Sequence, residues 1–374
     1  MPEKEGPSNL YPRRRFLQQA ALGGVSLASP LALSALSSCE TPAARKLGVA
    51  LVGLGGYSSG RLAPALEETQ YCQLSAIVTG TPSKAKKWAT QYKIPQSHIY
   101  SYETFDQMAD NPDIDIVYIV LPNSMHAEYT IRAAQAGKHV ICEKPMSVSV
   151  KEAEDMIAAC KKAGVKLQIG YRLQYEPHHL QLMQIGQEKR LGQVKLMECS
   201  NGFWGLNFDN WRFNRALSGG GPIMDMGIYC IQAARYTLGE EPIAVTAQTT
   251  KTYPEKFKEV EETMLWQMTF PSVAMASCIT SYAANLGRHF LTAERGTMEL
   301  NPAYGYGPLK GWINGEAMNL PHTNHQAVQM DAFARNILDH TPVKASGEDG
   351  LQDMKVIEAV FQAAQSGERV LITS

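Results

Sequence analysis

Three polar residues stand in settings that suit proton transfer beside a hydroxylated molecule. Lys144 lies between Glu143 and Pro145, where a strand is expected to stop because proline cannot continue the hydrogen-bonded ladder. Asp225 and Tyr229 are four residues apart after a glycine-rich loop, so a helix would place both side chains on one face. A tyrosine near a lysine can act as a general acid and base, because the ammonium stabilises the phenolate. From these residues alone, a surface lysine and a buried structural tyrosine remain open alternatives.

An earlier segment has the chemistry of a phosphate cradle. It reads G-x-G-x-x-S and contains Gly53, Gly55, Gly56, Tyr57 and Ser58. In such a motif the first glycine permits a tight turn, and the second lets the backbone approach a pyrophosphate at a helix N-terminus. Ser58 takes the third position, where the helix packs on the strand. Because an apolar run precedes the motif and a second one follows it, we predict a dinucleotide site.

The end of the second predicted strand indicates which dinucleotide binds. Enzymes that use NAD usually have an acidic residue there, which holds the ribose 2′-hydroxyl. This chain instead has hydroxyls at Thr79 and Ser83 and a cation at Lys84, which would suit a 2′-phosphate. NADP is therefore favoured over NAD, although Lys84 would also fit an ordinary solvated helix face.

The elements that must position these residues alternate regularly between residues 47 and 169. Short apolar runs typical of buried strands are followed in turn by helical segments, with short links between them. One helix is predicted to begin at Ser149, which forms a capping box with Glu152, and to end at Gly164. Strict alternation of this kind predicts a doubly wound parallel sheet, in which ligands bind at the carboxyl ends of the strands.

The segment LPNSMHAEYTIRAAQAGKHVICEKPM resembles the signature of the Gfo/Idh/MocA oxidoreductase family. The segments GYRLQYEP, DMGIYCIQAARYTLG and GEDGLQDMKVIEAVFQAAQSGERV extend the resemblance to the C-terminus, and resemble its glucose–fructose oxidoreductase subgroup. The resemblance implies an α/β fold with an N-terminal Rossmann-type sheet and a C-terminal α+β domain that has an open, mostly antiparallel sheet. We expect an NADP-binding domain at 47–170 and a substrate and dimerisation domain at 171–374.

The resemblance also assigns roles to individual residues. Tyr229 would take the proton from the anomeric hydroxyl; many members of the wider family have histidine at this position. Lys144 would tune the acidity of Tyr229, and Asp225 would orient the sugar. Beside the glycine loop, Thr79 and Lys84, the implied cofactor contacts are Leu121, Pro122, Asn123, His126, Glu143, Lys144 and Arg172. The expected sugar contacts are Lys144, Tyr171, Trp211, Arg212, Asp225 and Tyr229, with Tyr304 as a further candidate; packing is the alternative role for the aromatic residues.

The implied activity is that of a sugar oxidoreductase with tightly bound NADP(H). It would oxidise an aldose such as glucose to its lactone and pass the hydride to a second sugar such as fructose, in ping-pong order. An NAD-dependent glycoside hydrolase acting by transient oxidation, an NAD(P)-dependent aldose dehydrogenase and a sugar-binding lipoprotein without chemistry stay as alternatives.

The N-terminal segment predicts export. Arg13 and Arg14 precede a mildly apolar run to Leu36, which is typical of the twin-arginine signals that carry folded proteins to the periplasm. The following LSSC resembles a lipoprotein cleavage box, so we expect a signal at 1–39, a lipid on Cys39 and a linker at 40–46; a plain signal cut nearby is the alternative. Because the periplasm lacks a free nicotinamide pool, loading the cofactor before export would explain the need to fold first.

The charge and composition of the chain limit the classes of partner that we expect it to bind. The chain has 35 basic and 36 acidic residues among 374, so no basic face argues for nucleic acid, and small-molecule sugars are the expected partners. The only expected membrane contact is a lipid on Cys39. The seven cysteines and the histidines show no metal-site spacing, and the cysteines in apolar runs are expected to be free and buried. The resemblance implies a homodimer or homotetramer. Only about eight residues separate the cleavage box from the first strand, which leaves little room for the subgroup's long cofactor-wrapping arm.

Overall fold

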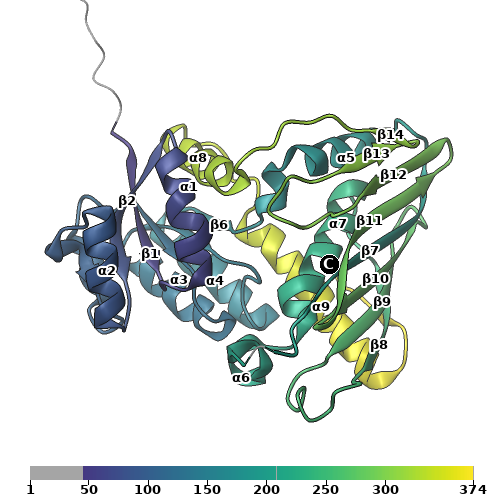
Figure 1. Ribbon diagram of the computed structural model, residues 1–374, viewed down its shortest axis with the longest axis horizontal. Helices are drawn as coiled ribbons and strands as arrows, with labels where there is room; N and C mark the ends of the chain where they lie inside the picture. The colour runs from purple at the N-terminus through teal and green to yellow at the C-terminus, as the bar shows by residue number, and fades with distance from the viewer. Residues whose placement is uncertain (1–44, 208, 374) are drawn as a thin grey trace, which may run out of the picture. The chain divides into compact units, whose positions relative to one another are not determined.

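The first sheet is parallel throughout and has the predicted doubly wound topology (Figure 1). The computed structural model describes residues 45–207 and 209–373. Within these ranges, the strands of the first sheet lie in the order β3 (Ile99–Tyr100), β2 (Cys72–Val78), β1 (Leu47–Val52), β4 (Ile116–Ile119), β5 (His139–Cys142) and β6 (Leu167–Ile169). Every residue of β1 is buried, which explains why it appears in the sequence as a continuous apolar run.

Helices connect the strands of this sheet, as the alternating pattern predicts. They are α1 (Ala63–Glu68), α2 (Pro82–Tyr92), α3 (His126–Gln135) and α4 (Val150–Ala163). At the start of α4, the Ser149 hydroxyl accepts a hydrogen bond from the Glu152 amide at 3.2 Å, and Glu152 accepts one from the Val148 amide at 3.1 Å. Gly164 ends the helix with a left-handed φ of 69°. The Ser149 half of the predicted capping box is confirmed, whereas Glu152 bonds the amide of the residue before the N-cap instead of the Ser149 amide.

The second sheet is open and mostly antiparallel, as expected. In the described part of the chain its strands lie in the order β14 (Glu316–Ala317), β13 (Gly311–Ile313), β12 (Gly296–Leu300), β11 (Ala283–Ala293), β7 (Val194–Trp204), β10 (Met275–Ser281), β9 (Thr263–Thr269), β8 (Ala244–Thr250) and β15 (Val370–Leu371). Only β7 and β10 pair in parallel there. The helices α5 (Pro177–Gln187), α7 (Ile228–Leu238) and α9 (Gly347–Ser366) lie on one side of it, and the short α6 (Arg215–Ser218) lies away from the sheet, near residues 123–125 (Figure 1).

The two faces of this sheet differ in what they bury. Along β9, Met264, Trp266 and Met268 are buried against the helices, in the alternation expected of a half-covered strand. On the opposite face Leu265 and Met275 are exposed by 41% and 40%, and Leu196, opposite Met275 in the neighbouring strand, by 54%. That face therefore carries exposed apolar side chains among polar ones, with Leu196 and Met275 side by side and Leu265 farther along the sheet.

Helix α8 (His325–Leu338) packs on the first sheet although it lies far beyond residue 170 (Figure 1). Its residues Met330 and Phe333 share a core with Leu62 and Ile77. The Asp331 carboxylate on the same helix accepts hydrogen bonds from the backbone at residues 70 and 71, at 2.8 to 3.1 Å. The core of the nucleotide-binding half is therefore completed by a late segment of the chain.

The cysteines in the described ranges are buried free thiols, as predicted. No helix within 45–207 or 209–373 combines the length and the apolar character needed to cross a bilayer. In the same ranges no three histidine, cysteine or acidic side chains are grouped so that they could hold a metal ion. The predicted signal, the cleavage box with Cys39 and most of the linker lie outside the described residues.

Candidate active site

A cleft of about 840 Å³ runs between the glycine loop and the second sheet. The first half of the chain lines it with Gly53–Tyr57, Thr79, Gly80, Thr81, Lys84, Tyr102, Val120–Asn123, Glu143, Lys144 and Arg172. The second half contributes Phe203, Asn210, Trp211, Arg212, Asp225, Met226, Tyr229, Tyr304 and Tyr306. The cleft therefore brings together most of the residues that the sequence singled out.

The glycine loop is shaped for the close approach of a ligand to its backbone. Gly53 has a φ of 91°, and a Cβ there would lie 2.4 Å from the Val120 carbonyl oxygen, so only glycine fits. A Cβ on Gly55 or Gly56 would meet no atom within 4 Å, so the space in front of the loop is open to a ligand. Ser58 is buried behind the loop and its hydroxyl donates to the Gly53 carbonyl at 2.6 Å. These residues fit the pyrophosphate of a dinucleotide.

The end of β2 presents hydroxyl and ammonium groups to the cleft. Thr79, Thr81 and Lys84 line it there, and the Thr79 hydroxyl accepts a hydrogen bond from the Thr81 amide at 3.2 Å. The carboxylates that line the cleft, Glu143 and Asp225, come from other elements. The groups at this end therefore fit a ribose 2′-phosphate better than a bare 2′-hydroxyl.

Glu143 is held in a fixed orientation at the end of β5. The Tyr118 hydroxyl donates to its Oε1 at 2.7 Å, and the Gln329 amide of α8 donates to that hydroxyl at 3.1 Å. Gly170 makes room for the carboxylate, since a Cβ there would lie 2.7 Å from Oε1. Burial raises the pKa of Glu143 above its usual value, although Tyr118 and Lys144 oppose the shift.

A second carboxylate, Asp225, lies between two cations. Lys144 Nζ donates to its Oδ1 at 3.0 Å and to its backbone carbonyl at 2.6 Å, and Arg212 Nε donates to its Oδ2 at 2.8 Å. Tyr282 donates to the same Oδ2 at 3.3 Å. Burial alone would raise the pKa of Asp225, but Lys144 and Arg212 hold it well below its usual value. Burial would likewise lower the pKa of Lys144, and the neighbouring Tyr229 and Asp225 raise it instead. Asp225 is therefore an ionised acceptor.

The hydroxyl of Tyr229 is contacted by Arg172. Arg172 Nε donates to it at 3.2 Å, while Lys144 Nζ lies over the ring of Tyr229, 4.9 Å from the centroid. The guanidinium is fixed by two further bonds, to the backbone carbonyls of Tyr304 at 2.6 Å and Gly305 at 3.0 Å. Because a guanidinium can only donate, the Tyr229 oxygen must accept, and its own proton is free to point elsewhere.

Asp225 and Tyr229 do not share a regular α-helix. Residues Ile223–Gly227 form a π-helical turn, and α7 begins only at Ile228. Both side chains nevertheless reach the cleft, as the four-residue spacing predicted. Such turns are frequent at functional sites, because the extra residue re-aims the side chains around it.

His325 fixes the other side of Arg172. Its Nε2 lies 3.3 Å from an Arg172 nitrogen, so Nε2 must accept and Nδ1 must carry the proton. That Nδ1 is buried and has no partner among the described residues. Burial, with Arg172 adding to it, lowers the pKa of His325 to about 3. A neutral histidine therefore supports a permanently charged arginine.

Two sequence-based assignments, those of Tyr171 and His126, differ from the structure. Tyr171, predicted to bind the sugar, is 1% exposed and packs near Asp353 instead of lining the cleft. Consecutive residues in the turn after β6 point in different directions, and Arg172 takes the position facing the cleft. His126 is also buried behind the site, where its ring nitrogens lie 2.8 Å from the Pro145 carbonyl and 3.0 Å from the Leu121 carbonyl. Ser58, in contrast, takes the packing position behind the loop that the sequence predicted.

Other cleft residues were missed by the sequence interpretation. Tyr306 and Phe203 line the cleft, and Tyr282 reaches Asp225 from the end of β10. Tyr306 lies two residues after the candidate Tyr304, so the presence of two tyrosines in one loop could have indicated that Tyr306 also lines the site. Phe203 and Tyr282 lie on or beside strands, where the alternation of apolar and polar residues predicts burial but not proximity to a ligand.

Comparisons with known proteins agree with this geometry. Two protein-family models match the sequence. The model of the oxidoreductase family with an NAD-binding Rossmann fold (GFO_IDH_MocA) matches residues 47–171, and the model of the GFO/IDH/MocA C-terminal domain matches residues 179–300. D-xylose 1-dehydrogenase [NADP(+)] from Haloarcula marismortui is 30% identical over 332 residues, which cover 86% of this chain and 92% of that protein. The 1,5-anhydro-D-fructose reductase of Ensifer adhaerens is 26% identical over 313 residues, 79% of this chain and 90% of that protein. The solved structure of aldose-aldose oxidoreductase from Caulobacter crescentus, complexed with glycerol, is 42% identical, with a TM-score of 0.85 and coverage of 87% of this chain and 100% of that one.

Proposed function

The chain belongs to the Gfo/Idh/MocA oxidoreductase family and is a sugar oxidoreductase, and from this premise we propose that it moves a hydride from an aldose to a second sugar through a tightly held NADP(H). One observation carries the proposal. The ionised Asp225, the cations that fix it and the hydroxyl of Tyr229 converge at one end of a cleft whose other end is the glycine cradle. A site that can form hydrogen bonds with hydroxyl groups therefore adjoins a site that fits a dinucleotide.

The choice of NADP rests on the residues at the end of β2. Thr79, Thr81 and Lys84 offer two hydroxyls and a positive charge where NAD enzymes place a carboxylate. The NADP(+) named for the Haloarcula marismortui relative supports the same choice. Backbone amides of the glycine loop would hold the pyrophosphate. The chemistry supplied by bound NADP(H) is the acceptance and return of a hydride.

The side chains of the protein bind the sugar and handle its proton. Asp225 accepts hydrogen bonds from the sugar hydroxyls, and its two cationic partners keep it ionised and oriented. Acting from its phenolate form, Tyr229 takes the proton of the hydroxyl that is oxidised, and the resulting phenol later gives that proton to the carbonyl oxygen of the second sugar. Arg172 orients the Tyr229 oxygen from behind, and Lys144 places its charge over the ring. Trp211 lines the sugar end of the cleft.

A simpler NADP-dependent aldose dehydrogenase is the second candidate. The name of the Haloarcula marismortui relative, D-xylose 1-dehydrogenase [NADP(+)], favours it. The name of the Caulobacter crescentus structure, aldose-aldose oxidoreductase, favours transfer between two sugars. The two candidates differ in whether the cofactor leaves the protein between half-reactions.

We further propose a folded, cofactor-loaded protein that is exported to the periplasm, with a lipid on Cys39, and that forms a homodimer. The twin-arginine pattern at Arg13 and Arg14 supports export. The exposed apolar side chains of Leu196, Leu265 and Met275 support a dimer through the outer face of the second sheet, because exposed apolar surface often marks protein interfaces. Sedimentation of the wild type and of Leu265→Glu would test the interface, and a monomeric wild type would contradict it.

The test of the activity begins with the purified protein as it is isolated. We expect denaturation to release stoichiometric NADP(H), and we expect mixing with an aldose alone to produce the absorbance of the reduced nicotinamide. Adding a second sugar should then abolish that absorbance without free cofactor. Turnover that requires a continuous supply of added NADP would favour the dehydrogenase. The absence of released nucleotide together with dependence on added NAD would contradict the proposal. Tyr229→Phe is the matched inactive variant, because it removes only a hydroxyl.

A further inference from the structure

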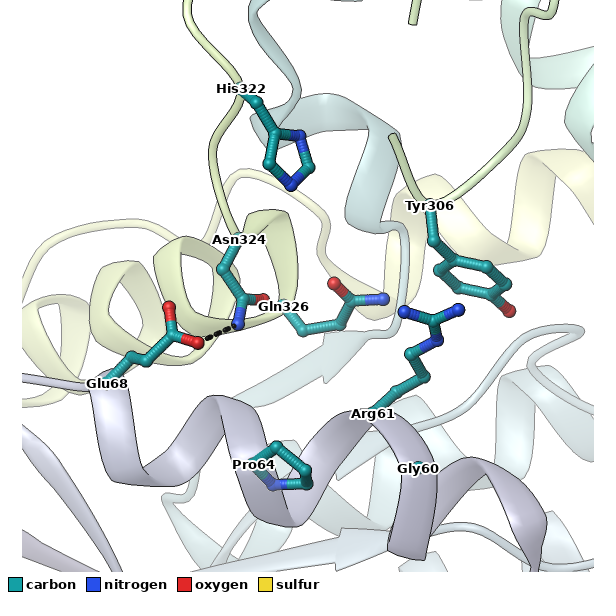
Figure 2. Close-up of a pocket in the computed structure, with 8 residues that line it drawn as sticks. All are labelled: Gly60, Arg61, Pro64, Glu68, Tyr306, His322, Asn324 and Gln326. Atoms are coloured by element: carbon teal, nitrogen blue, oxygen red, sulfur yellow. Dashed lines mark hydrogen bonds between the residues drawn. The ribbon is translucent and has the colours of Figure 1, made fainter. Parts of the chain in front are cut away.

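A second pocket of about 400 Å³ lies outside the cleft, between the helical turn that follows the glycine loop and the segment that leads into α8 (Figure 2). Arg61 and Glu68 line it from one side, His322, Asn324 and Gln326 from the other, and Tyr306 at one end. Its volume falls in the range of about 300–1,000 Å³ that is usual for small-molecule sites. Its polar lining has no part in the proposed chemistry of the cleft.

The two ends of this pocket carry opposite charges. At one end the Arg61 guanidinium lies 4.3 Å from the centre of the Tyr306 ring and forms no ion pair with any described residue. Figure 2 shows the Gln326 amide pointing toward this guanidinium. At the other end the Asn324 amide donates to Glu68 Oε1 at 2.9 Å, which leaves Oε2 available to accept. Six residues of helix lie between Arg61 and Glu68, so the two charges are spaced along the pocket.

This distribution of charge selects the chemistry of the ligand. A simple anion would be attracted by Arg61 but repelled by Glu68. A simple cation would be attracted by Glu68 but repelled by Arg61. A molecule with a carboxylate at one end and hydroxyl groups along its length satisfies both ends. Its carboxylate would accept charge-assisted hydrogen bonds from Arg61, and its hydroxyls would donate to Glu68 and exchange hydrogen bonds with the two amides.

We propose that this pocket binds a small polyhydroxylated carboxylate, a sugar acid of the aldonate type. The identity of the ligand rests on the proposed function, because oxidation of an aldose at its anomeric carbon yields a lactone. When water adds to the lactone carbonyl and the ring C–O bond breaks, an aldonate and one proton result. The reaction proposed for the cleft thus leads to a molecule with the features that the second pocket recognises.

Tyr306 connects the second pocket with the cleft. It lines both, and the guanidinium carbon of Arg172 lies 4.3 Å from the centre of the same ring. Arg172 in turn donates to the Tyr229 hydroxyl. A ligand that engages Arg61 therefore acts on a ring that packs against the residue positioning Tyr229. We expect the sugar acid to lower kcat without competing with the sugar for the cleft.

Calorimetric titration of the isolated, nucleotide-loaded protein tests the proposal. The probes are D-gluconate, D-glucitol, which has the hydroxyls but no carboxylate, and propionate, which has the carboxylate but no hydroxyls. We expect gluconate to bind more tightly than either, and Arg61→Gln to weaken its binding at least tenfold. Glu68→Gln should weaken it less, and Arg369→Gln, a change of an exposed arginine near the C-terminus, should have no effect. Equal gluconate binding by the wild type and Arg61→Gln would overturn the proposal, as would equal binding of glucitol or propionate.

A second variant separates this pocket from the cleft. Asp225→Asn alters the sugar end of the cleft, so gluconate bound in the cleft would be lost, whereas gluconate bound beside Arg61 should remain. Loss of binding in Asp225→Asn, with retention in Arg61→Gln, would place the ligand in the cleft and refute the inference. Thermal unfolding of each variant checks that it folds. If hydride transfer fails while gluconate still depends on Arg61, the proposed function is wrong and the pocket stands. If transfer is intact and gluconate does not bind, the pocket assignment is wrong and the proposed function stands.

Discussion

Replacing Arg172 should slow the chemistry without weakening sugar binding. Its Nε donates to the Tyr229 hydroxyl at 3.2 Å, and this contact determines where the phenol can direct its own proton. A hydrogen bond from a charged donor is worth about 1.5–3 kcal/mol, which corresponds to about 10- to 150-fold in rate. We therefore expect Arg172→Met to lower kcat by that factor. The KM for the aldose should change little, because Asp225 and its partners remain.

The same change should also cost stability, and this must be separated from the effect on rate. Arg172→Met leaves the buried carbonyls of Tyr304 and Gly305 without their donor, at about 1–3 kcal/mol for each unsatisfied group. Arg172→Lys keeps the charge and one donor, so it should recover part of the stability and part of the rate.

Single-turnover reduction of the bound nucleotide by an aldose gives the rate, and thermal unfolding gives the stability. Released nucleotide is measured for each variant. An unchanged kcat in Arg172→Met would refute the positioning role. A variant that folds but loses its nucleotide would show that Arg172 holds the cofactor instead.

Three further predictions concern the cradle, the cofactor choice and the response to pH. Gly55→Val fills the open space before the loop, so nucleotide content on purification should fall, while the nucleotide-free forms of the variant and the wild type should unfold at the same temperature; retained nucleotide would contradict this. Lys84→Ala should weaken rebinding of NADP to the stripped protein about tenfold, the value of one charge-assisted hydrogen bond, and leave NAD unaffected; equal losses would argue against a 2′-phosphate site. Burial lowers the pKa of His289 to about 3, so below about pH 6.5 the unfolded chain takes up a proton that the folded chain refuses. Because of this group, the free energy of unfolding should fall by about 1.4 kcal/mol for each unit by which the pH is lowered. His289→Phe should flatten this dependence, measured by denaturant titrations at several pH values. Identical pH dependences in the two proteins would contradict the prediction.

The sequence predicts the first sheet well because local signals and the tertiary structure agree there. The strands β1, β4 and β6 are short and fully buried, and the Ser149 cap and Gly164 mark the ends of a helix without reference to distant residues. Lys144 could be placed in a crevice for the same reason, since the carboxyl ends of parallel strands share one edge of the sheet.

The sequence does not predict contacts that depend on the path of a long chain. Arg61 and Tyr306 are 245 positions apart in the chain, yet the guanidinium lies over the ring. Tyr171 and Arg172 are neighbours in the sequence, and only the backbone direction after β6 decides which of them enters the cleft. His126 matches a family pattern, but its position behind the Leu121 and Pro145 carbonyls could be learned only from the folded chain.

The packing of α8 on the first sheet has a consequence for how the protein is made. Chains leave the ribosome from the N-terminus, so residues 47–169 emerge long before residues 325–338. Until then Leu62 and Ile77 lack the cover of Met330 and Phe333, and Tyr118 lacks the Gln329 amide that helps to hold Glu143. The nucleotide-binding half would therefore mature only after nearly the whole chain has been synthesised. Acquisition of the cofactor then becomes a post-translational step, and a nascent chain that stalls before α8 would carry an unfinished cradle.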